Sequence, residues 1–550
     1  MTDRSLEFLT LGGTGEVGMN LALYGYGGKW IMVDCGVTFG DEFTPGIDVI
    51  VPDIAFVEEI AQDLLGIVLT HAHEDHYGAI PHLWRRIGCP VFGTPFACGL
   101  LRRKLEEAEL DRVVPLNEVP CGGGVDLGPF RIDFIPVAHS IPETQALAIR
   151  TPAGIVLHAT DWKLDDGPLI GPRTDPAPFQ ALGREGVIAM MCDSTNAMVP
   201  GRAGSEAAVR ESLIEVIRRC KRRVAVACFA SNVARLETVA MAARANGREI
   251  GLVGRSLWNV TTVARDCGYL QDCPPFLTEY DAGFLPPERT VLAVTGSQGE
   301  ARAALARIAA DDHPEIVLEA GDTVIFSSRE IPGNEKAIGR VQNMLARAGV
   351  KVITADDDFV HVSGHPRREE LVEMYGWVKP PLVIPIHGER RMQDANAALA
   401  RECGAAQTVI VDNGDRVRLH PGPAEIVGQE QSGRFGVEGS RLLPLGGEVL
   451  KARRRLSYAG MAVATVVVDE KGRLRGEPRL SVSGLLDGTD EDAGLHEDAL
   501  DAIRDGFERL SPKARRDDDA VEESVRRELR RALRRATGRR TPVEIHVVRV

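Results

Sequence analysis

The sequence contains no apolar run that approaches the roughly 20 residues needed to cross a membrane as a helix. Residues 1–11 have neither a basic start nor an apolar stretch of signal-peptide length. Membrane anchoring and secretion are therefore not indicated. We expect a cytoplasmic protein with no membrane partner.

Clustered cysteines are also absent. The 10 cysteines are scattered, and no two of them form a C-x-x-C pair. Zinc ribbons and disulfide frameworks both depend on such spacing. We therefore expect free thiols that pack as small apolar side chains, and we assign none of them to chemistry.

An excess of positive charge is missing as well. The formal net charge is −14 at pH 7, which excludes a protein that coats nucleic acid with a globally basic surface. A nucleic-acid enzyme stays compatible with this charge, because it needs only a local basic channel and because acidic metal ligands add negative charge.

The chain is long enough for several hydrophobic cores, since 550 residues exceed what one core usually serves. The first part of the sequence predicts strands joined by glycine turns. From Ser205 onward it predicts longer helices and parallel-type strands, and near Pro381 the pattern of the first part is found again. Glycine-rich, helix-poor sequence then suggests a linker. We predict an α/β domain over residues 1–204 and 370–424, an inserted α/β domain over 205–369, a linker over 425–452 and a C-terminal α/β domain over 453–550.

One glycine motif imitates a dinucleotide-binding fingerprint. Gly13, Gly15 and Gly18 have the G-x-G-x-x-G spacing, and Asp34 lies downstream. The segment before the next strand is too short and too rich in glycine for a crossover helix. We therefore predict a β-hairpin there, and expect Asp34 to orient a metal ligand.

The strongest chemical signal is the segment 71–76, HAHEDH, directly after an apolar strand. It offers His71, His73, Asp75 and His76, and a loop at a strand end can turn neighbouring side chains toward one point. Imidazole with carboxylate suits zinc or manganese better than calcium. The alternative is a solvated polar loop, or a single core histidine with surface neighbours.

Three further residues repeat this setting, because His139, Asp161 and His387 each follow an apolar strand. Taken singly, such a residue is more often a satisfied buried polar group than a ligand. Together with the HAHEDH segment, the three residues would complete two metal sites.

These residues resemble the ligand set of the metallo-β-lactamase superfamily. The resemblance implies that His71, His73 and His139 hold one metal, that Asp75, His76 and His387 hold the other, and that Asp161 bridges them. The large insertion between Asp161 and His387 resembles the β-CASP nucleases. In that branch Asp193 matches motif A, His365 motif B and His387 motif C.

Within that branch, three strings are similar to the ribonuclease J family: LGGTGEVGMN (11–20), TGSQGE (295–300) and FSSREIPGNE (326–335). The family usually has proline where this chain has Ala301, and glycine where it has Thr160. The fold implied is an α/β protein, an αββα sandwich with an inserted β-CASP α/β domain and a small C-terminal α/β domain.

The resemblance also implies an activity: a two-metal ribonuclease that hydrolyses RNA as a 5′-to-3′ exonuclease with endonuclease activity, in RNA processing and decay. Two divalent ions per chain are expected, zinc first, with manganese or magnesium as alternatives. The implied partners are 5′-monophosphorylated single-stranded RNA and further copies of the chain, in a homodimer or homotetramer.

We expect His365, Asp75 and Asp193 to be catalytic, with His365 protonating the leaving oxygen. A structural histidine in a glycine turn is the alternative for His365. Substrate contacts are expected from His361, Ser363, Gly364 and His365, and from Ser231, Asn232, Ser327, Ser328 and Arg329, although serine and asparagine loops are often plain turns. The basic run 526–540 is first a solvated helix face, and second an RNA or subunit contact.

Three other functions stay open at this point. A hydrolase of small thioesters, like glyoxalase II, would use the same metals but does not need the large insertion. A DNA-directed β-CASP nuclease would share every motif. A non-catalytic RNA-binding or scaffold protein is the third alternative, and such a protein would be expected to have lost ligands.

Overall fold

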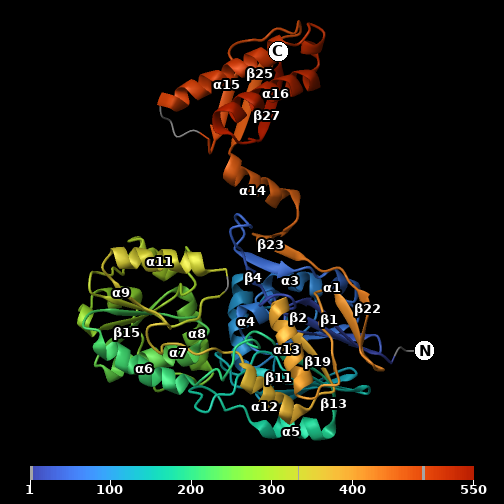
Figure 1. The fold of residues 1–550 in the computed structure, drawn as a ribbon, viewed down its shortest axis with the longest axis vertical. Helices are drawn as coiled ribbons and strands as arrows, with labels where there is room; N and C mark the ends of the chain where they lie inside the picture. The colour runs from blue at the N-terminus through green and yellow to red at the C-terminus, as the bar shows by residue number, and fades with distance from the viewer. Residues whose placement is uncertain (1–3, 332, 486–489) are drawn as a thin grey trace. The chain divides into compact units, whose positions relative to one another are not determined.

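A computed structural model describes residues 4–331, 333–485 and 490–550; Pro332, which belongs to one of the strings above, lies outside them. The chain forms two compact units, one of residues 1–38 and 51–433, the other of residues 39–50 and 434–550. Within the described residues, no helix is long and apolar enough to cross a membrane. Figure 1 shows the course of the chain.

Two β-sheets form the centre of the first unit. The eight-stranded sheet has the order β22 (Glu425–Gln429), β21 (Asp415–His420), β1 (Leu6–Gly12), β2 (Leu21–Tyr26), β3 (Lys29–Val33), β6 (Leu64–Val68), β7 (Val91–Gly93) and β8 (Leu116–Glu118). The seven-stranded sheet has the order β20 (Gln407–Thr408), β19 (Leu382–Ile386), β13 (Val187–Asp193), β12 (Gly154–His158), β11 (Gln145–Thr151), β10 (Phe130–Pro136) and β9 (Gly124–Leu127).

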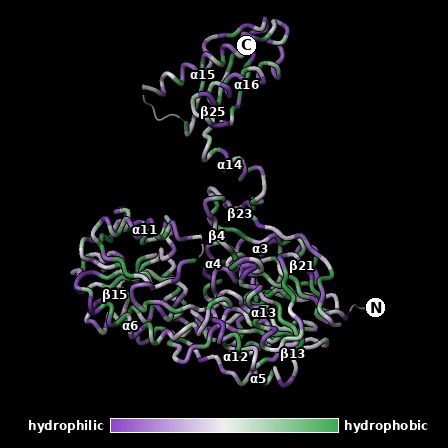
Figure 2. The backbone as a smooth tube through the Cα atoms, in the orientation of Figure 1, coloured by the Kyte–Doolittle hydropathy of each residue, from purple (hydrophilic) through white to green (hydrophobic). Residues whose placement is uncertain are grey.

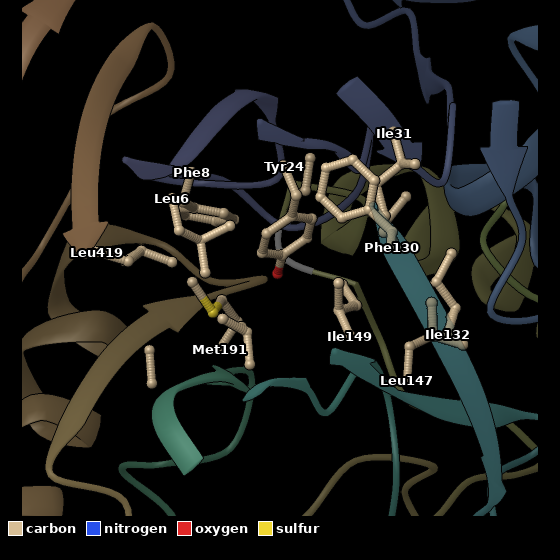
Figure 3. Close-up of a cluster of buried hydrophobic side chains, with 14 of the residues drawn as sticks. Leu6, Phe8, Tyr24, Ile31, Phe130, Ile132, Leu147, Ile149, Met191 and Leu419 are labelled. Carbon is tan, nitrogen blue, oxygen red and sulfur yellow. The ribbon is translucent and has the colours of Figure 1, made fainter. Parts of the chain in front are cut away.

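The inner faces of the two sheets share one hydrophobic core. Phe8 and Tyr24 from the first sheet belong to the same buried cluster as Phe130, Ile149 and other residues of the second sheet (Figure 3). Figure 2 shows hydrophobic residues along these inner strands. Burial of this apolar surface holds the sheets together.

Helices form the outer layers. On the seven-stranded sheet lie α5 (Pro176–Glu185), α12 (Arg368–Val378) and α13 (Arg390–Glu402), whose apolar residues join a second buried cluster with that sheet. Against the eight-stranded sheet lie α1 (Ala55–Glu59), α3 (Ile80–Ile87) and α4 (Pro95–Glu107). The αββα sandwich expected from the sequence is therefore present.

The predicted hairpin is confirmed. Strands β2 and β3 pair antiparallel, and Gly27 and Gly28 turn the chain between them with positive φ angles of 61° and 77°. No helix intervenes, so the glycine motif that precedes β2 does not open a dinucleotide-binding unit.

A third sheet is inserted between β13 and β19 of the sandwich. Its five strands are all parallel, in the order β15 (Glu249–Val253), β16 (Thr290–Val294), β14 (Val224–Ala227), β17 (Thr323–Phe326) and β18 (Lys351–Ile353). Around it lie α6 (Glu206–Arg219), α7 (Val233–Ala245), α8 (Arg255–Asp266), α9 (Glu279–Gly283), α10 (Ala304–Ala309) and α11 (Glu335–Arg347). Parallel strands buried on both faces explain the continuous apolar runs in this region.

A buried ion pair lies where the inserted domain begins. Arg235 is fully buried, and its guanidinium contacts both carboxylate oxygens of Glu206 at 3.0 and 3.1 Å. It also donates to the backbone carbonyls of Ser327 at 2.7 Å and Val360 at 3.1 Å. Arg235 therefore links α6 and α7 to the end of β17 and to the chain that returns toward the sandwich.

We expect Arg235→Met to lower the free energy of unfolding by about 3–5 kcal/mol, because Glu206 would stay buried without its partner. Urea unfolding followed by circular dichroism measures this loss. The double variant Arg235→Met, Glu206→Leu removes both charges and should recover part of the stability. A single variant as stable as the parent would show that the pair is not stabilising.

The second unit contains β23 (Arg434–Glu438), β24 (Arg441–Pro444), α14 (Glu448–Ala459) and a sheet of β26 (Arg479–Ser483), β25 (Met461–Val468) and β27 (Val543–Arg549). Two helices, α15 (Asp490–Glu508) and α16 (Asp518–Thr537), pack against each other and against this sheet. Two short strands, β4 (Thr38–Phe39) and β5 (Val49–Pro52), are also present.

The predicted linker over residues 425–452 contains regular secondary structure. Strand β22 extends the eight-stranded sheet at its edge, β23 and β24 form a hairpin, and α14 begins at Glu448. Gly439, with a φ of 58°, lies in the hairpin turn, and the two strands that it joins are only 5 and 4 residues long. The exact domain boundaries stay a prediction.

Candidate metal centre

Four strands of one sheet end at the same edge of the sandwich. Strands β12, β13 and β19 are mutually parallel, and β10 runs in the same direction because both it and β12 are antiparallel to β11. At or just after their carboxyl ends stand His139, Asp161, Asp193 and His387. Residues separated by more than 200 positions in sequence therefore meet at one place, as their repeated position after apolar strands suggested.

The HAHEDH segment reaches the same place from the other sheet. It follows β6, and His73 is the residue before the short helix α2 (Glu74–Tyr77). Asp34, at the end of β3, fixes this segment: its carboxylate accepts from the backbone N–H of Thr70 at 2.8 Å and from the Thr70 hydroxyl at 2.8 Å. The same carboxylate lies 2.7 Å from Nδ1 of His76.

A first group of ligand-capable atoms comprises His71, His73, His139 and Asp161, whose atoms all lie within 4.8 Å of one another. Nε2 of His71 and Nε2 of His139 each lie 3.1 Å from Nδ1 of His73. Both also lie 3.8 Å from Oδ2 of Asp161. Three imidazole nitrogens thus face one point beside a carboxylate, which is the donor set that zinc prefers.

A second group comprises Asp75, His76 and His387. Nε2 of His387 lies 3.2 Å from Oδ2 of Asp75, and Nε2 of His76 lies 3.3 Å from Oδ2 of Asp161. Nδ1 of His387 lies 3.6 Å from Oδ1 of Asp161. The carboxylate of Asp161 therefore contacts both groups, which is the position of a bridging ligand.

The polar atoms at this place fit divalent cations. Oδ1 of Asp161 is buried and accepts no hydrogen bond among the described residues. Burial lowers the pKa of His73 to about 4, so its imidazole is neutral and can offer a lone pair. Burial also opposes the charged form of His76, but the carboxylates of Asp161, Asp75 and Asp34 outweigh it and raise the pKa of His76 to about 10. The carboxylates around His76 therefore favour a positive charge at this place, and a bound metal ion would provide it.

Asp193 and His365 lie beside the two groups and form a third set of ligand-capable atoms with Asp161 and His387. Oδ2 of Asp193 accepts from Nδ1 of His365 at 2.8 Å. Burial lowers the pKa of His365, but the nearby carboxylates of Asp193 and Asp161 exceed this effect, so that the pKa is raised overall. The His365 side chain is 22% exposed, whereas Asp193 is fully buried. A substrate can therefore reach the histidine from solvent.

The His361–His365 loop is built into the site. Gly364 offers its carbonyl oxygen to Nδ1 of His139 at 2.6 Å, which directs Nε2 of that histidine toward His73. Asn196 donates to the Ser363 hydroxyl at 2.8 Å and to the His365 carbonyl at 3.2 Å. Nδ1 of His361 lies 3.5 Å from the Arg235 guanidinium.

The remaining predicted contacts are partly committed to the fold. Asn232 caps α7, since its side chain accepts from the N–H of Arg235, and the Ser327 hydroxyl donates to the Val360 carbonyl at 2.7 Å. Ser328 is buried. Arg329 donates to Asn196, which places it beside the His365 loop. Ser231 precedes the cap residue and is half-buried.

Sequence reasoning missed several residues that hold this site. Asn20 donates to the Asp75 carbonyl at 3.1 Å and lies 3.0 Å from Nε2 of His76. The Thr195 hydroxyl lies 2.9 Å from Nδ1 of His387. Thr160, where the family usually has glycine, has a φ of 53° and donates to the Thr70 hydroxyl at 2.9 Å. Asn20, Thr160 and Thr195 all lie in or beside the motifs quoted above. This position was the only feature of the sequence that could have indicated their role.

Comparison with known proteins supports each part of this fold. The chain matches the models for the metallo-beta-lactamase superfamily at residues 15–180, the ribonuclease J beta-CASP domain at 221–345, the Zn-dependent metallo-hydrolase RNA specificity domain at 349–411 and the ribonuclease J C-terminal domain at 448–550.

Full-length relatives decide the family. A ribonuclease J of Sinorhizobium meliloti is 43% identical over 553 residues, covering 100% of this chain and 98% of that protein. The chain belongs to the ribonuclease J family. A ribonuclease J of Mycobacterium tuberculosis is 38% identical and spans 96% of this chain and 94% of its own length.

A solved structure agrees with the fold. A protein of unknown function from Enterococcus faecalis superposes with a TM-score of 0.53 at 15% identity, over 75% of this chain and 99% of that one.

As a member of the ribonuclease J family, the chain is a metallo-hydrolase with a β-CASP insertion, and its histidine and aspartate cluster supports the use of divalent metal.

Proposed function

We propose that this ribonuclease J family member is a two-metal ribonuclease that hydrolyses RNA phosphodiester bonds in the cytoplasm. The observation that carries the proposal is the convergence of seven imidazole and carboxylate side chains at strand ends of both sheets, where the buried Oδ1 of Asp161 accepts no hydrogen bond among the described residues. Relatives named ribonuclease J over their full length support RNA as the substrate.

In this proposal each group holds one ion. His71, His73 and His139 would hold the first, Asp75, His76 and His387 would hold the second, and Asp161 would contribute to both sites. Zinc suits the imidazole-rich first group best, with manganese or magnesium as alternatives. Bound divalent ions would supply the Lewis acidity that ionises a water near neutral pH and neutralises the phosphoryl oxygens.

The chain's own residues hold the proton that the leaving group needs. Asp193 accepts from Nδ1 of His365 at 2.8 Å and favours the protonated imidazolium, so that Nε2 can carry the proton for the leaving oxygen. His365 is outside the two groups assigned to metal, and its exposure admits a phosphodiester. We assign the protonation of the leaving oxygen to His365 and its positioning to Asp193.

The residues best placed to contact RNA lie beside Asp193 and His365. Ser363 and Gly364 flank His365, and Arg329 is tied to the same loop through Asn196, so its guanidinium can face a phosphate. His361 would act with them. Ser231, Asn232, Ser327 and Ser328 stay predictions, and the internal bonds of Asn232 and Ser327 leave these two less able to reach RNA.

The proposed mode is 5′-to-3′ exonuclease cleavage of 5′-monophosphorylated single strands, with endonuclease cleavage as a second mode, in RNA processing and decay. A homodimer or homotetramer is the expected assembly, and light scattering on the purified protein measures it.

Matched substrates test the proposal. RNA and DNA oligonucleotides of one sequence, each with a labelled 5′ phosphate, are incubated with the purified protein beside a small thioester. We expect labelled mononucleotide from RNA, which indicates exonuclease cleavage, and labelled fragments where cutting is internal. Hydrolysis of DNA alone, or of the thioester alone, would replace the proposal with a DNA nuclease or a glyoxalase II-like enzyme.

A further prediction concerns Asp34, which binds His76 without belonging to either group. We expect Asp34→Asn to weaken metal binding by roughly 10–100-fold, since partners that orient a ligating histidine typically have this effect. Competition with a metal-binding dye measures the affinity. Asp63→Asn is the matched control, because Asp63 pairs with Lys29 on the surface. Equal affinities in both variants would contradict the orienting role.

A further inference from the structure

Helix α16 carries a face made only of arginine. Its buried side consists mainly of Val521, Val525, Leu529 and Leu533, which pack into the core of the second unit. The opposite side, in the second half of the helix, bears Arg527, Arg530, Arg531, Arg534 and Arg535, all exposed. These positions follow the i, i+3, i+4, i+7, i+8 spacing of one helix face. We call them the arginine face.

Most of these charges have no partner among the described residues. Arg527 and Arg531 lie 3.5 and 2.9 Å from the carboxylate of Glu528, which Arg509 also contacts at 3.0 Å. Arg530, Arg534 and Arg535 form no side-chain hydrogen bond or ion pair within the described residues, and neither do Arg539 and Arg540 just past the helix. Elsewhere in the chain, exposed arginines such as Arg86, Arg102, Arg131 and Arg218 pair with carboxylates.

Helix stability does not explain the arrangement. Like charges three or four residues apart destabilise a helix, and glutamate at half of these positions would turn repulsion into attraction. The helix macrodipole favours cations in the last turn, which covers Arg534 and Arg535 only. Arg530, Arg539 and Arg540 lie outside that turn. An external polyanion would relieve the repulsion along the whole face.

The chemistry of the face favours nucleic acid over protein. Protein interfaces have an apolar or aromatic centre, and this arc of α16 has none. Guanidinium groups match phosphate in a bidentate manner, and without aromatic side chains the face cannot stack on bases. Such a surface binds the sugar–phosphate backbone and does not read sequence. The neighbouring helix α15 exposes Glu497, Asp498 and Asp501, which would repel RNA and confine it to α16.

We propose that the arginine face of α16, extended by Arg539 and Arg540, is a second RNA-binding surface that grips the phosphate backbone independently of sequence. The proposal rests on RNA being the substrate. A strand held at two surfaces is bound more tightly than at either one, because the second contact becomes intramolecular. Long RNA should therefore gain from this surface, and RNA too short to occupy both should not.

The test uses the full chain with Arg530, Arg534, Arg535, Arg539 and Arg540 all replaced by glutamine, which is a good helix former. The control replaces five exposed arginines that have carboxylate partners, Arg86, Arg102, Arg131, Arg218 and Arg307, and so loses the same charge. Binding of a 40-nucleotide RNA is measured across salt concentrations with chelator present, so that hydrolysis cannot interfere.

We expect the slope of log affinity against log salt to fall by about 3.5 in the test variant, at roughly 0.7 per phosphate contact on a single strand. The control should keep the parent slope. With metal restored, KM for the long RNA should rise at least about tenfold while kcat, and hydrolysis of a six-nucleotide RNA, stay unchanged. The double variant Arg539→Gln, Arg540→Gln, which lies beyond Gly538 and leaves the helix intact, should lower the slope by about 1.4.

Equal salt slopes in the test variant, the double variant and the control would overturn the proposal. Loss of self-association in light scattering, with RNA binding retained, would overturn it in favour of a contact between copies. If the parent binds RNA with the expected slope but hydrolyses none, the proposed function fails while this surface stands.

Discussion

Replacing Asp161 with asparagine is expected to reduce RNA hydrolysis by more than about 10⁴-fold, because loss of both ions should exceed the roughly 10²–10⁴ that one general acid contributes. The carboxylate of Asp161 lies within 3.8 Å of ring nitrogens of His71, His76 and His139, so it contacts both sets of ligand atoms. An amide in its place keeps the shape but removes the charge that two cations would share.

Metal content and turnover of this variant are measured together. We expect Asp161→Asn to retain fewer than two ions per chain by elemental analysis and to be inactive. Asp166→Asn is the matched control, since Asp166 is exposed and pairs with Arg173 on the surface. An Asp161→Asn protein that hydrolysed RNA at the parent rate would point to a contaminating nuclease or to a different site.

His365→Ala is expected to lower turnover by roughly 10²–10⁴-fold, the usual contribution of a general acid. Metal content should not change, because the side chain belongs to neither group assigned to metal. The two readouts together separate loss of proton transfer from loss of metal. Single-turnover rates on 5′-labelled RNA measure the effect without interference from product release.

Two variants sharpen this prediction. Asp193→Asn removes the negative charge that favours the protonated form of His365, so turnover should also fall while metal content again stays constant. His82→Ala removes a histidine on α3 and should change neither property. Parent-like turnover in His365→Ala would end the general-acid assignment and leave His365 a structural residue of its glycine turn.

Much of the fold follows from local pattern. Apolar runs of strand length, each followed by a polar residue, predicted the strands β6, β10, β12 and β19, and glycine pairs predicted the β2–β3 hairpin. The meeting of these strand ends could not be derived from spacing, since it depends on which strands pair and in which direction. The resemblance to a known family provided that pairing, and the sheet topology now explains it.

Other features were beyond the reach of sequence. The carbonyl of Gly364 that orients His139 is a backbone group, and any residue could offer it. Asn20 and Thr195 support metal-site histidines from distant segments, and only the folded chain shows the contacts. The arginines of α16 are visible in the sequence as a basic run. Only the structure shows whether carboxylates neutralise these arginines or leave them available to a ligand.

The central claim is that two divalent ions, held by seven side chains of this chain, hydrolyse RNA. Metal-free protein titrated with zinc or manganese, with RNA hydrolysis measured at each step, tests it most directly. The account predicts no hydrolysis without metal and a rate that reaches its maximum at two ions per chain. Hydrolysis that persists in the metal-free protein, or a maximum reached at one ion per chain, would contradict it.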